Sequence, residues 1–231
     1  MILAAGRGER MRPLTDTVPK PLLSVGGKPL IVRHIENLAR GGFRCIVVNH
    51  AHLGTMIEER LGDGSDFGVE INYSREAEAL ETAGGIVFAL HLLGDAPFLV
   101  VNGDTYCELD FGTLARRLPI MKAAGTLAHL VLVANPPHHP AGDFALEGGR
   151  IRNAATSQLT FSGVALYCPE LFVGLAPGQK AKLAPLLRRA AEAGAVTGEH
   201  FRGRWEDVGT PERLAQLDRE LAQRAAEHAR G

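Results

Sequence analysis

The sequence has few cysteines and contains no long apolar run. Only three of its 231 residues are cysteine, and Cys45, Cys107 and Cys168 lack the paired spacing of a disulfide framework or a zinc site. We therefore expect three buried thiols. No apolar run approaches the length of a membrane span, and the first residues carry no basic segment of a signal peptide. These absences predict a cytoplasmic protein that does not contact a membrane.

Neither sign of charge dominates the chain. It has 25 Lys and Arg against 26 Asp and Glu, which gives a formal net charge of -1. Such a balance provides no general attraction for nucleic acid or for an anionic membrane. Any binding of phosphate must therefore be local, and this favours a small ligand and argues against nucleic acid. Hydrophobic residues make up 45% of the chain, which is enough apolar material for a core.

Short β-branched runs alternate with amphipathic segments in the first half of the chain. The predicted strands are Met1–Ala5, Cys45–Asn49, Val69–Tyr73, Phe98–Val101, His129–Ala134 and Thr160–Tyr167. Helices are predicted at Leu30–Arg40 and Gly84–Leu93. Strands and helices that alternate at this spacing imply right-handed crossovers. The predicted fold is α/β, a three-layer α/β/α sandwich with a Rossmann-like mixed, mainly parallel sheet.

The pattern changes after Asp104. A hairpin is predicted over Phe144–Asn153, with Gly148 and Gly149 at the turn. The last predicted helix is Pro211–Ala229, with Thr210 as its N-cap. Because no repeat or linker is visible, we predict a single domain over residues 1–231 and make no prediction of oligomeric state.

A glycine-rich run follows the first predicted strand. Residues 3–15 read LAAGRGERMRPLT, and residues 19–22 read PKPL. Gly6 and Gly8 allow backbone N–H groups to approach anionic oxygens, while Arg10 and Lys20 add positive charge. Two glycines alone also make an ordinary tight turn. The run does not end as a Walker A loop does, and Met11 stands where the dinucleotide fingerprint has its third glycine.

Two acidic residues and one further loop are candidates for ligand binding. Asp104 ends an apolar strand at the carboxyl edge of the predicted sheet, where such sheets bind ligands, although it also suits a turn cap. Asp207 precedes the last helix and is a weak signal by itself. The segment Glu78–Gly85 opens a helix with glycines that would allow close approach to a flat base. The same segment also reads as a plain helix start with Thr82 as the cap.

The glycine-rich run resembles the signature of the sugar-1-phosphate nucleotidyltransferases, which is close to LAAGxGxR(M/L)xPLT followed by PKP. The resemblance implies that the loop wraps a nucleoside triphosphate, that Arg10 contacts its phosphates and that Lys20 steadies the α-phosphate. It implies that Asp104 and Asp207 hold Mg²⁺, which suits hard oxygen ligands. The implied catalytic residues are Arg10, Lys20 and Asp104. The implied nucleotide-binding residues of the loop are Ala5, Gly6, Gly8, Glu9, Arg10 and Lys20.

Glu81 resembles one subfamily, the N-acetylmuramate 1-phosphate uridylyltransferases, whereas relatives that use GTP typically read LGTAG here. The subfamily also shares the motifs Asn49–Ala51, Gly142–Phe144, Leu159–Gly163, Lys182–Arg188 and Gly198–Gly203. The resemblance assigns the nucleotide's base to Glu78, Glu81 and Gly84. It assigns the sugar phosphate to Asn102, Asp143, Ser162, Gly163 and Lys182, of which Lys182 also reads as a solvated helix-start lysine. Ala83 departs from the pattern, because close relatives often have glycine there.

The resemblance as a whole implies transfer of a uridylyl group from UTP to N-acetylmuramate α-1-phosphate in peptidoglycan recycling. The alternatives are a nucleotidyltransferase for mannose or glucose 1-phosphate, a cytidylyltransferase for phosphocholine, or a non-catalytic nucleotide-sugar-binding regulatory relative. The regulatory alternative is disfavoured by the joint presence of Arg10, Lys20, Asp104 and Asp207. His138 and His139 have no third ligand for a zinc site and are predicted to be surface residues.

Overall fold

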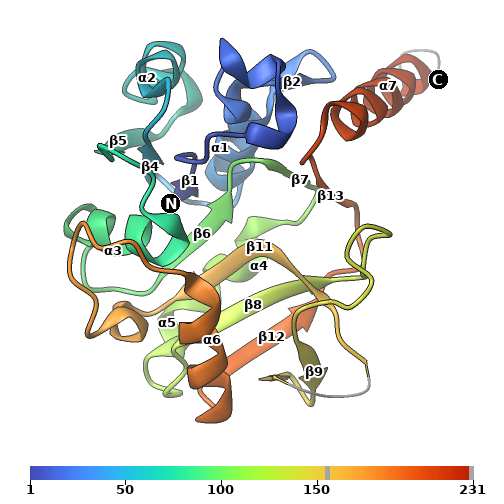
Figure 1. The fold of residues 1–231 in the computed structure, drawn as a ribbon. Helices are drawn as coiled ribbons and strands as arrows, with labels where there is room; N and C mark the ends of the chain where they lie inside the picture. Colours follow the sequence, from blue (N-terminus) through green and yellow to red (C-terminus); the bar gives the residue numbers. More distant parts are fainter. Residues whose placement is uncertain (154–156, 229–231) are drawn as a thin grey trace.

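The computed structural model describes residues 1–153 and 157–228. A nine-stranded sheet forms its centre, in the order β5-β4-β1-β6-β11-β8-β12-β10-β9 (Figure 1). The strands are β1 (Ile2–Leu3), β4 (Cys45–His50), β5 (Glu70–Arg75), β6 (Phe98–Asn102), β8 (Ala128–Val133), β9 (Ala145–Glu147), β10 (Arg150–Arg152), β11 (Thr160–Tyr167) and β12 (Val196–His200). Two short ribbons lie outside this sheet, β2 (Ser24–Val25) with β3 (Lys28–Pro29) and β7 (Thr105–Cys107) with β13 (Trp205–Asp207).

Most strands of the main sheet run in one direction. Strands β5, β4, β1 and β6 are parallel to one another, and β12 is parallel to β8. Within the described residues, only β11 and β10 run against the rest. The prediction of a mixed, mainly parallel sheet is therefore confirmed. The predicted hairpin is also present as β9 and β10, with Gly148 and Gly149 both at positive φ, as a tight two-residue turn requires.

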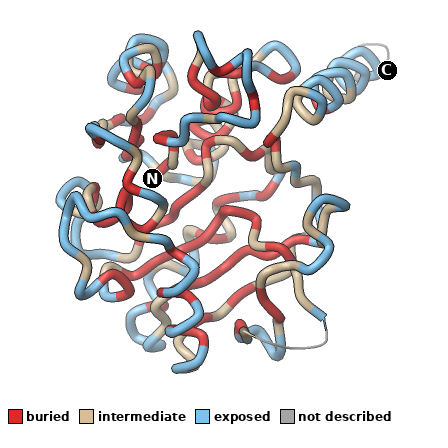
Figure 2. Tube along the Cα trace, viewed as in Figure 1, coloured by how far each residue is buried: buried red, intermediate tan, exposed pale blue. Residues whose placement is uncertain are grey.

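Helices cover both faces of the sheet, and the three-layer prediction is confirmed. One face packs against α3 (Glu81–Leu93) and α6 (Leu183–Glu192), whose buried residues share a core with β8 and β11. The other face packs against α1 (Leu30–Arg40), α2 (Gly54–Leu61), α4 (Phe111–Ala115) and α5 (Leu118–Met121). Figure 2 shows the strands buried between these exposed outer layers.

The last helix, α7 (Pro211–His228), packs against β2 at the edge of the molecule (Figure 1). Leu217 is buried there with Val25, and the Gly26 N–H donates to Asp218. The Thr210 hydroxyl accepts from the Arg213 N–H, so the predicted N-cap is confirmed. The end of the predicted helix, Ala229, lies outside the described residues.

Three details differ from the sequence-based predictions. Strand β1 is shorter than predicted because the Ala4 N–H donates to the side chain of Asn49 and leaves the strand ladder. Helix α3 begins three residues early, at Glu81. The prediction of three buried thiols is correct only for Cys168, because Cys107 is partly exposed and Cys45 is exposed as the first residue of β4. Among the described residues, no helix combines the length and apolarity that crossing a membrane requires.

Candidate active site

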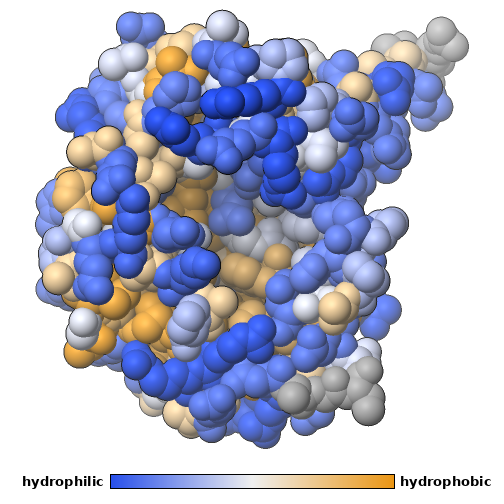
Figure 3. Space-filling model, viewed as in Figure 1, coloured by the Kyte–Doolittle hydropathy of each residue, from blue (hydrophilic) through white to orange (hydrophobic). Residues whose placement is uncertain are grey.

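A cavity of about 360 Å³ opens where β1, β4 and β6 end. Parallel strands bring their carboxyl ends to one edge of a sheet, so short loops after three strands converge there. Figure 3 shows the hollow near the centre of the face seen in Figure 1, with hydrophilic residues around its rim. Six of the predicted site residues line it: Ala5, Gly6, Lys20, Glu81, Asn102 and Asp104.

The glycine-rich loop leaves β1 and makes one wall of the cavity. Gly8 has a φ of 65°, and a Cβ there would lie 2.9 Å from Thr15 Cγ2 and 3.2 Å from Lys20 Cβ. Glycine is therefore required at this position by both the turn and the packing. At Gly6 a Cβ would meet nothing within 4 Å, so the backbone of this residue faces open space. Arg10 is exposed and forms no ion pair with any described residue.

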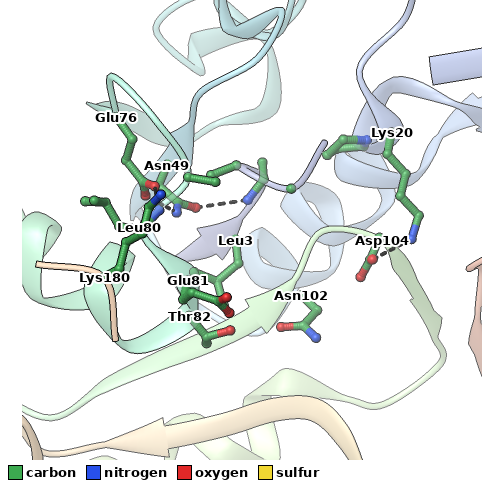
Figure 4. Close-up of a pocket in the computed structure, with 15 residues that line it drawn as sticks. Leu3, Lys20, Asn49, Glu76, Leu80, Glu81, Thr82, Asn102, Asp104 and Lys180 are labelled. Carbon is green, nitrogen blue, oxygen red and sulfur yellow. Dashed lines mark hydrogen bonds and ion pairs between the residues drawn. The ribbon is translucent and has the colours of Figure 1, made fainter. Parts of the chain in front are cut away.

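Lys20 and Asp104 form an ion pair at one end of the cavity (Figure 4). The Lys20 Nζ lies 2.5 Å from Asp104 Oδ2, and the lysine side chain is 7% exposed against 37% for the aspartate. Lys20 is held in a 3-10 turn, while Asp104 follows Gly103, whose N–H donates to the Leu3 carbonyl. The pair thus joins the glycine-rich loop to the end of β6.

Asp207 reaches the same region through the ribbon of β7 and β13. It pairs with Thr105, the residue after Asp104, and the Val208 N–H donates to the Asp104 carbonyl at 3.3 Å. The Asp207 side chain accepts from Arg213 Nη1 at 2.7 Å. Asp207, on β13, therefore lies beside the turn before β7 that carries Asp104, although the two acids are far apart in sequence.

No group of three or more His, Cys, Asp or Glu side chains within residues 1–153 and 157–228 has the arrangement of a metal site. Asp104 and Asp207 offer two carboxylates, and within the described part of the chain only one oxygen of each takes part in an ion pair or hydrogen bond. This donor set does not fit a closed zinc site, which needs four protein ligands. It fits Mg²⁺, which binds one or two carboxylates and keeps other positions for water and phosphate oxygens.

A buried network that the sequence did not reveal forms the floor of the cavity. Asn49 accepts from the Ala4 N–H and donates to Glu76 Oε1 at 2.6 Å, and Glu76 Oε2 accepts from the Leu80 N–H at 2.9 Å. Burial raises the pKa of Glu76, and its hydrogen bonds to Asn49 and Leu80 oppose the shift. Asn49 belongs to a motif noted above, but nothing in the sequence marked Glu76. The network fixes the ends of β1 and β4 against the loop that leads into α3.

The segment predicted to contact the base divides into three parts. Glu81 lines the cavity, and Glu78 pairs with Lys180 Nζ at 2.7 Å at its edge. Gly84 is buried under the chain at residues 179–181, because a Cβ there would lie 2.4 Å from the Gln179 carbonyl oxygen. This close packing is sufficient to explain why residue 84 is a glycine. Thr82 lines the cavity and is not the N-cap, a position that Leu80 occupies.

The residues predicted for the sugar phosphate are not all brought together. Asn102 lines the cavity and lies against Gly163, where a Cβ would be 2.5 Å from Asn102 Nδ2. Asp143 accepts from the Phe161 N–H at 2.8 Å. Lys182 is exposed at the start of α6 and outside the cavity lining.

Ser162, which was also predicted to contact the sugar phosphate, is buried in β11. Its hydroxyl donates to the Val131 carbonyl at 2.7 Å and accepts from the Val164 N–H, and the residue is 1% exposed. Both partners are backbone groups of the sheet, one on β8 and one within the irregular part of β11, so the hydrogen bonds of the hydroxyl are satisfied inside the sheet. The Ser162 side chain is therefore unavailable to a ligand in this structure.

The two histidines that received no role contact predicted site residues. The Nε2 of His138 lies 3.2 Å from Asp207 Oδ2, and that of His139 lies 3.1 Å from Asp143 Oδ1. Both side chains are about 40% exposed, so the prediction of surface residues is correct. No pattern in the sequence marked these contacts, nor the contact of Arg213 with Asp207. The contact of His138 with Asp207 joins segments that are far apart in the chain, whereas the other two join residues four and six positions apart.

Comparison with known proteins gives consistent results. Residues 1–224 match the nucleotidyl transferase family. The N-acetylmuramate alpha-1-phosphate uridylyltransferase of Neisseria meningitidis serogroup B is 55% identical over 94% of this chain and 95% of its own length. A protein of the same name from Caulobacter vibrioides is 32% identical over 96% of each chain. A crystal structure of a candidate glucose-1-phosphate thymidylyltransferase from Bacillus anthracis, with sucrose bound, has a TM-score of 0.84 over 96% of this chain and 94% of its own. Its sequence identity is 23%, so this likeness concerns the fold alone.

Proposed function

The chain belongs to the nucleotidyl transferase family, and we propose that it joins N-acetylmuramate α-1-phosphate to UTP, giving a UDP-sugar and pyrophosphate. The single observation that best supports this reaction is the Lys20–Asp104 pair, which lies beside the glycine-rich loop in one cavity. The choice of substrates is supported by the 55% identity to the Neisseria protein, over nearly the full length of both chains.

The glycine-rich loop would hold the triphosphate. The backbone at Ala5 and Gly6 lines the cavity, and no side chain occupies the space above Gly6. Lys20 would then lie beside the α-phosphate, where a fixed cation stabilises the charge that develops on non-bridging oxygens. Arg10, which is exposed and has no ion-pair partner among the described residues, is free to bind the outer phosphates.

Asp104 and Asp207 would hold Mg²⁺ in the proposed reaction. When bound, the ion would offset the negative charge of the substrate phosphates. Lys20 would have to release or share Asp104, and Arg213 would do the same for Asp207. Both cations would thereby become available to phosphate oxygens.

The proposed reaction is a direct in-line attack. A sugar phosphate is largely a dianion at neutral pH, because its second pKa is about 6, so its oxygen needs no general base. The contribution of the protein is to hold the two substrates in line, a task for Asn102 on the sugar side and Lys20 on the nucleotide side. No covalent enzyme intermediate is required.

The choice of N-acetylmuramate α-1-phosphate places the protein in peptidoglycan recycling. That salvage of a cell-wall sugar would take place in the cytoplasm, where UTP is available. The proposal involves neither nucleic acid nor a membrane partner.

Pyrophosphate release tests the proposal. UTP, GTP, CTP and dTTP are each paired, with Mg²⁺, with the 1-phosphates of N-acetylmuramate, N-acetylglucosamine, glucose and mannose. We expect turnover chiefly with UTP and N-acetylmuramate α-1-phosphate. A preference for another pair would retain the chemistry and reject the substrates. No turnover with any pair, together with measurable nucleotide binding, would instead favour a non-catalytic binding protein.

A further inference from the structure

A second cavity, of about 270 Å³, opens at the carboxyl ends of β8 and β12. These two strands are parallel to each other and to β6, so the chain leaves all three at the same edge of the sheet. Figure 1 shows the chain continuing from the tip of β12 to β13, the strand that carries Asp207. The edge that forms the candidate active site therefore extends across β11 into this second cavity.

Arg202 brings a positive charge to the second cavity. Its side chain is exposed and has no hydrogen bond or ion pair within residues 1–153 and 157–228. None of the described residues that line the cavity is acidic. Burial and the nearby Arg202 guanidinium lower the pKa of His200, which also lines the cavity. The cavity thus holds a cation that no carboxylate of the lining offsets, and this favours a negatively charged ligand group.

The other walls of the second cavity are mainly apolar. Val133 is buried at the end of β8, and Ala134 and Phe201 lie beside it in the lining. Trp205 adds an aromatic ring, and its indole N–H is already used, because it donates to the Ser162 carbonyl at 2.8 Å. A ligand group that suits this space has a small apolar part and one anionic end.

Trp205 connects the second cavity to the candidate active site. It precedes Asp207 by two residues on β13, and alternate side chains of a strand point to the same face, about 7 Å apart. The Ser162 carbonyl that holds the indole lies next to Gly163, where a Cβ would be 2.5 Å from Asn102 Nδ2 in the first cavity. A continuous floor therefore joins the two cavities.

A sugar 1-phosphate with its phosphate near Asp104 could extend along this floor. The acceptor proposed above carries a second anionic group, the carboxylate of its lactyl ether, which N-acetylglucosamine 1-phosphate lacks. The lysines that line the first cavity, Lys20 and Lys180, already have carboxylate partners. Arg202 has none, and the planar guanidinium offers two parallel N–H donors that match the two oxygens of a carboxylate.

We infer that the second cavity is a specificity site for acidic sugar 1-phosphates, in which Arg202 binds the carboxylate of the sugar. The methyl group of the lactyl ether packs against the apolar wall at Ala134 and Phe201. The inference rests on the proposed function for the reaction, and it goes further by naming the residue that selects an acidic sugar over a neutral one.

The test compares Arg202→Gln with Arg116→Gln. Arg116 is a matched control because it is exposed and lies outside the lining of both cavities. Both variants should keep the wild-type melting temperature. Arg202→Gln should lower kcat/KM for N-acetylmuramate α-1-phosphate by at least about tenfold, with a change of less than about twofold for N-acetylglucosamine 1-phosphate. Equal losses with both sugars, or no loss with either, would overturn the inference.

An acceptor whose lactyl carboxylate is converted to the amide locates the contact. The wild type should lose on the amide about the same factor that Arg202→Gln loses on the acid. Arg202→Gln should show no further loss on the amide, because two changes to one interacting pair are not additive. Fully additive losses would reject a direct contact between Arg202 and the carboxylate.

Equilibrium binding separates this inference from the proposed function. Calorimetric titration of the two sugar 1-phosphates into the wild type and Arg202→Gln needs no turnover. If the wild type turns over no pair, the proposed function fails, yet weaker binding of N-acetylmuramate α-1-phosphate alone by Arg202→Gln would still support the carboxylate site. Equal binding of this sugar by both proteins, or an equal loss for both sugars, would overturn it.

Discussion

The ammonium group of Lys20 lies 2.5 Å from a carboxylate oxygen of Asp104, although 84 residues separate them in the chain. The lysine is almost fully buried and the aspartate is half-exposed at the cavity. The contact ties the glycine-rich loop to the end of β6, and it places a cation and an anion side by side where substrate phosphates would meet. Removal of either residue should therefore change both the stability of the fold and the activity.

Replacement of Asp104 by alanine should abolish Mg²⁺-dependent turnover, with a fall in kcat/KM of at least about 10²-fold. It should also destabilise the fold by about 1–3 kcal/mol, because Lys20 is left buried without its partner. Activity and urea unfolding measure the two effects. Glu170→Ala is the control, since it removes a surface ion pair with Lys122 and should change stability by less than about 1 kcal/mol. Near-normal activity of Asp104→Ala would reject the metal assignment.

Replacement of Asp207 by alanine should have a similar effect on activity with a smaller effect on stability. Arg213, its partner, is partly exposed and can be solvated when the carboxylate is lost. Turnover measured as a function of Mg²⁺ concentration should show no recovery in Asp207→Ala. Glu206→Gln is a matched control because Glu206 precedes Asp207 on β13, where alternate side chains point to opposite faces. If the two variants behave alike, Asp207 is not a metal ligand.

Stability should fall between about pH 6.5 and pH 4 because of His34. Burial lowers the pKa of His34 from 6.5 to about 4, and the neutral ring donates from Nε2 to the Thr105 carbonyl at 2.7 Å. The unfolded state binds the proton more readily, so the contribution is complete above about pH 6.5 and is lost as the pH falls towards 4. The expected size is roughly 3 kcal/mol.

Denaturant unfolding of the wild type and His34→Gln across this pH range measures the contribution. The variant should show the shallower dependence on pH, while His52→Gln, a change at an exposed position, should follow the wild type. Parallel curves for the wild type and His34→Gln would show that His34 does not cause the loss. Because His34 holds Thr105, which lies between Asp104 and β13, activity should fall over the same range.

Alanine substitutions at Gly6 and Gly84 should differ in their effects on stability and on nucleotide affinity. The Gly84→Ala methyl group would lie 2.4 Å from a backbone oxygen, so we expect destabilisation by about 1–3 kcal/mol. The Gly6→Ala methyl group meets no atom within 4 Å and enters the cavity, so stability should be kept while nucleotide affinity falls. Thermal unfolding and UTP titration measure both. A stable Gly84→Ala, or a Gly6→Ala with unchanged affinity, would contradict the respective structural role.

Local patterns predicted the elements that pack along their whole length. The bounds of α1 and β11 agree with the predictions, because α1 meets the core in every turn and β11 is buried along nearly its whole length. Strand β1 and the start of α3 were placed less well. Their limits depend on hydrogen bonds from distant side chains, Asn49 for β1 and Glu76 for the start of α3.

The sequence by itself determined the α/β architecture and the glycine-rich loop with its lysine, since both follow from periodicity and from backbone freedom within a few residues. Only the tertiary structure decided which acids, amides and cations meet. It brought Asp207 beside Asp104 through β13, bonded the Ser162 hydroxyl to the backbone of β8 and β11, and left the Glu81 carboxylate without a partner among the described residues. The physical reason is that contacts between distant segments depend on strand register and on the face to which each side chain points, and neither is set by nearby residues.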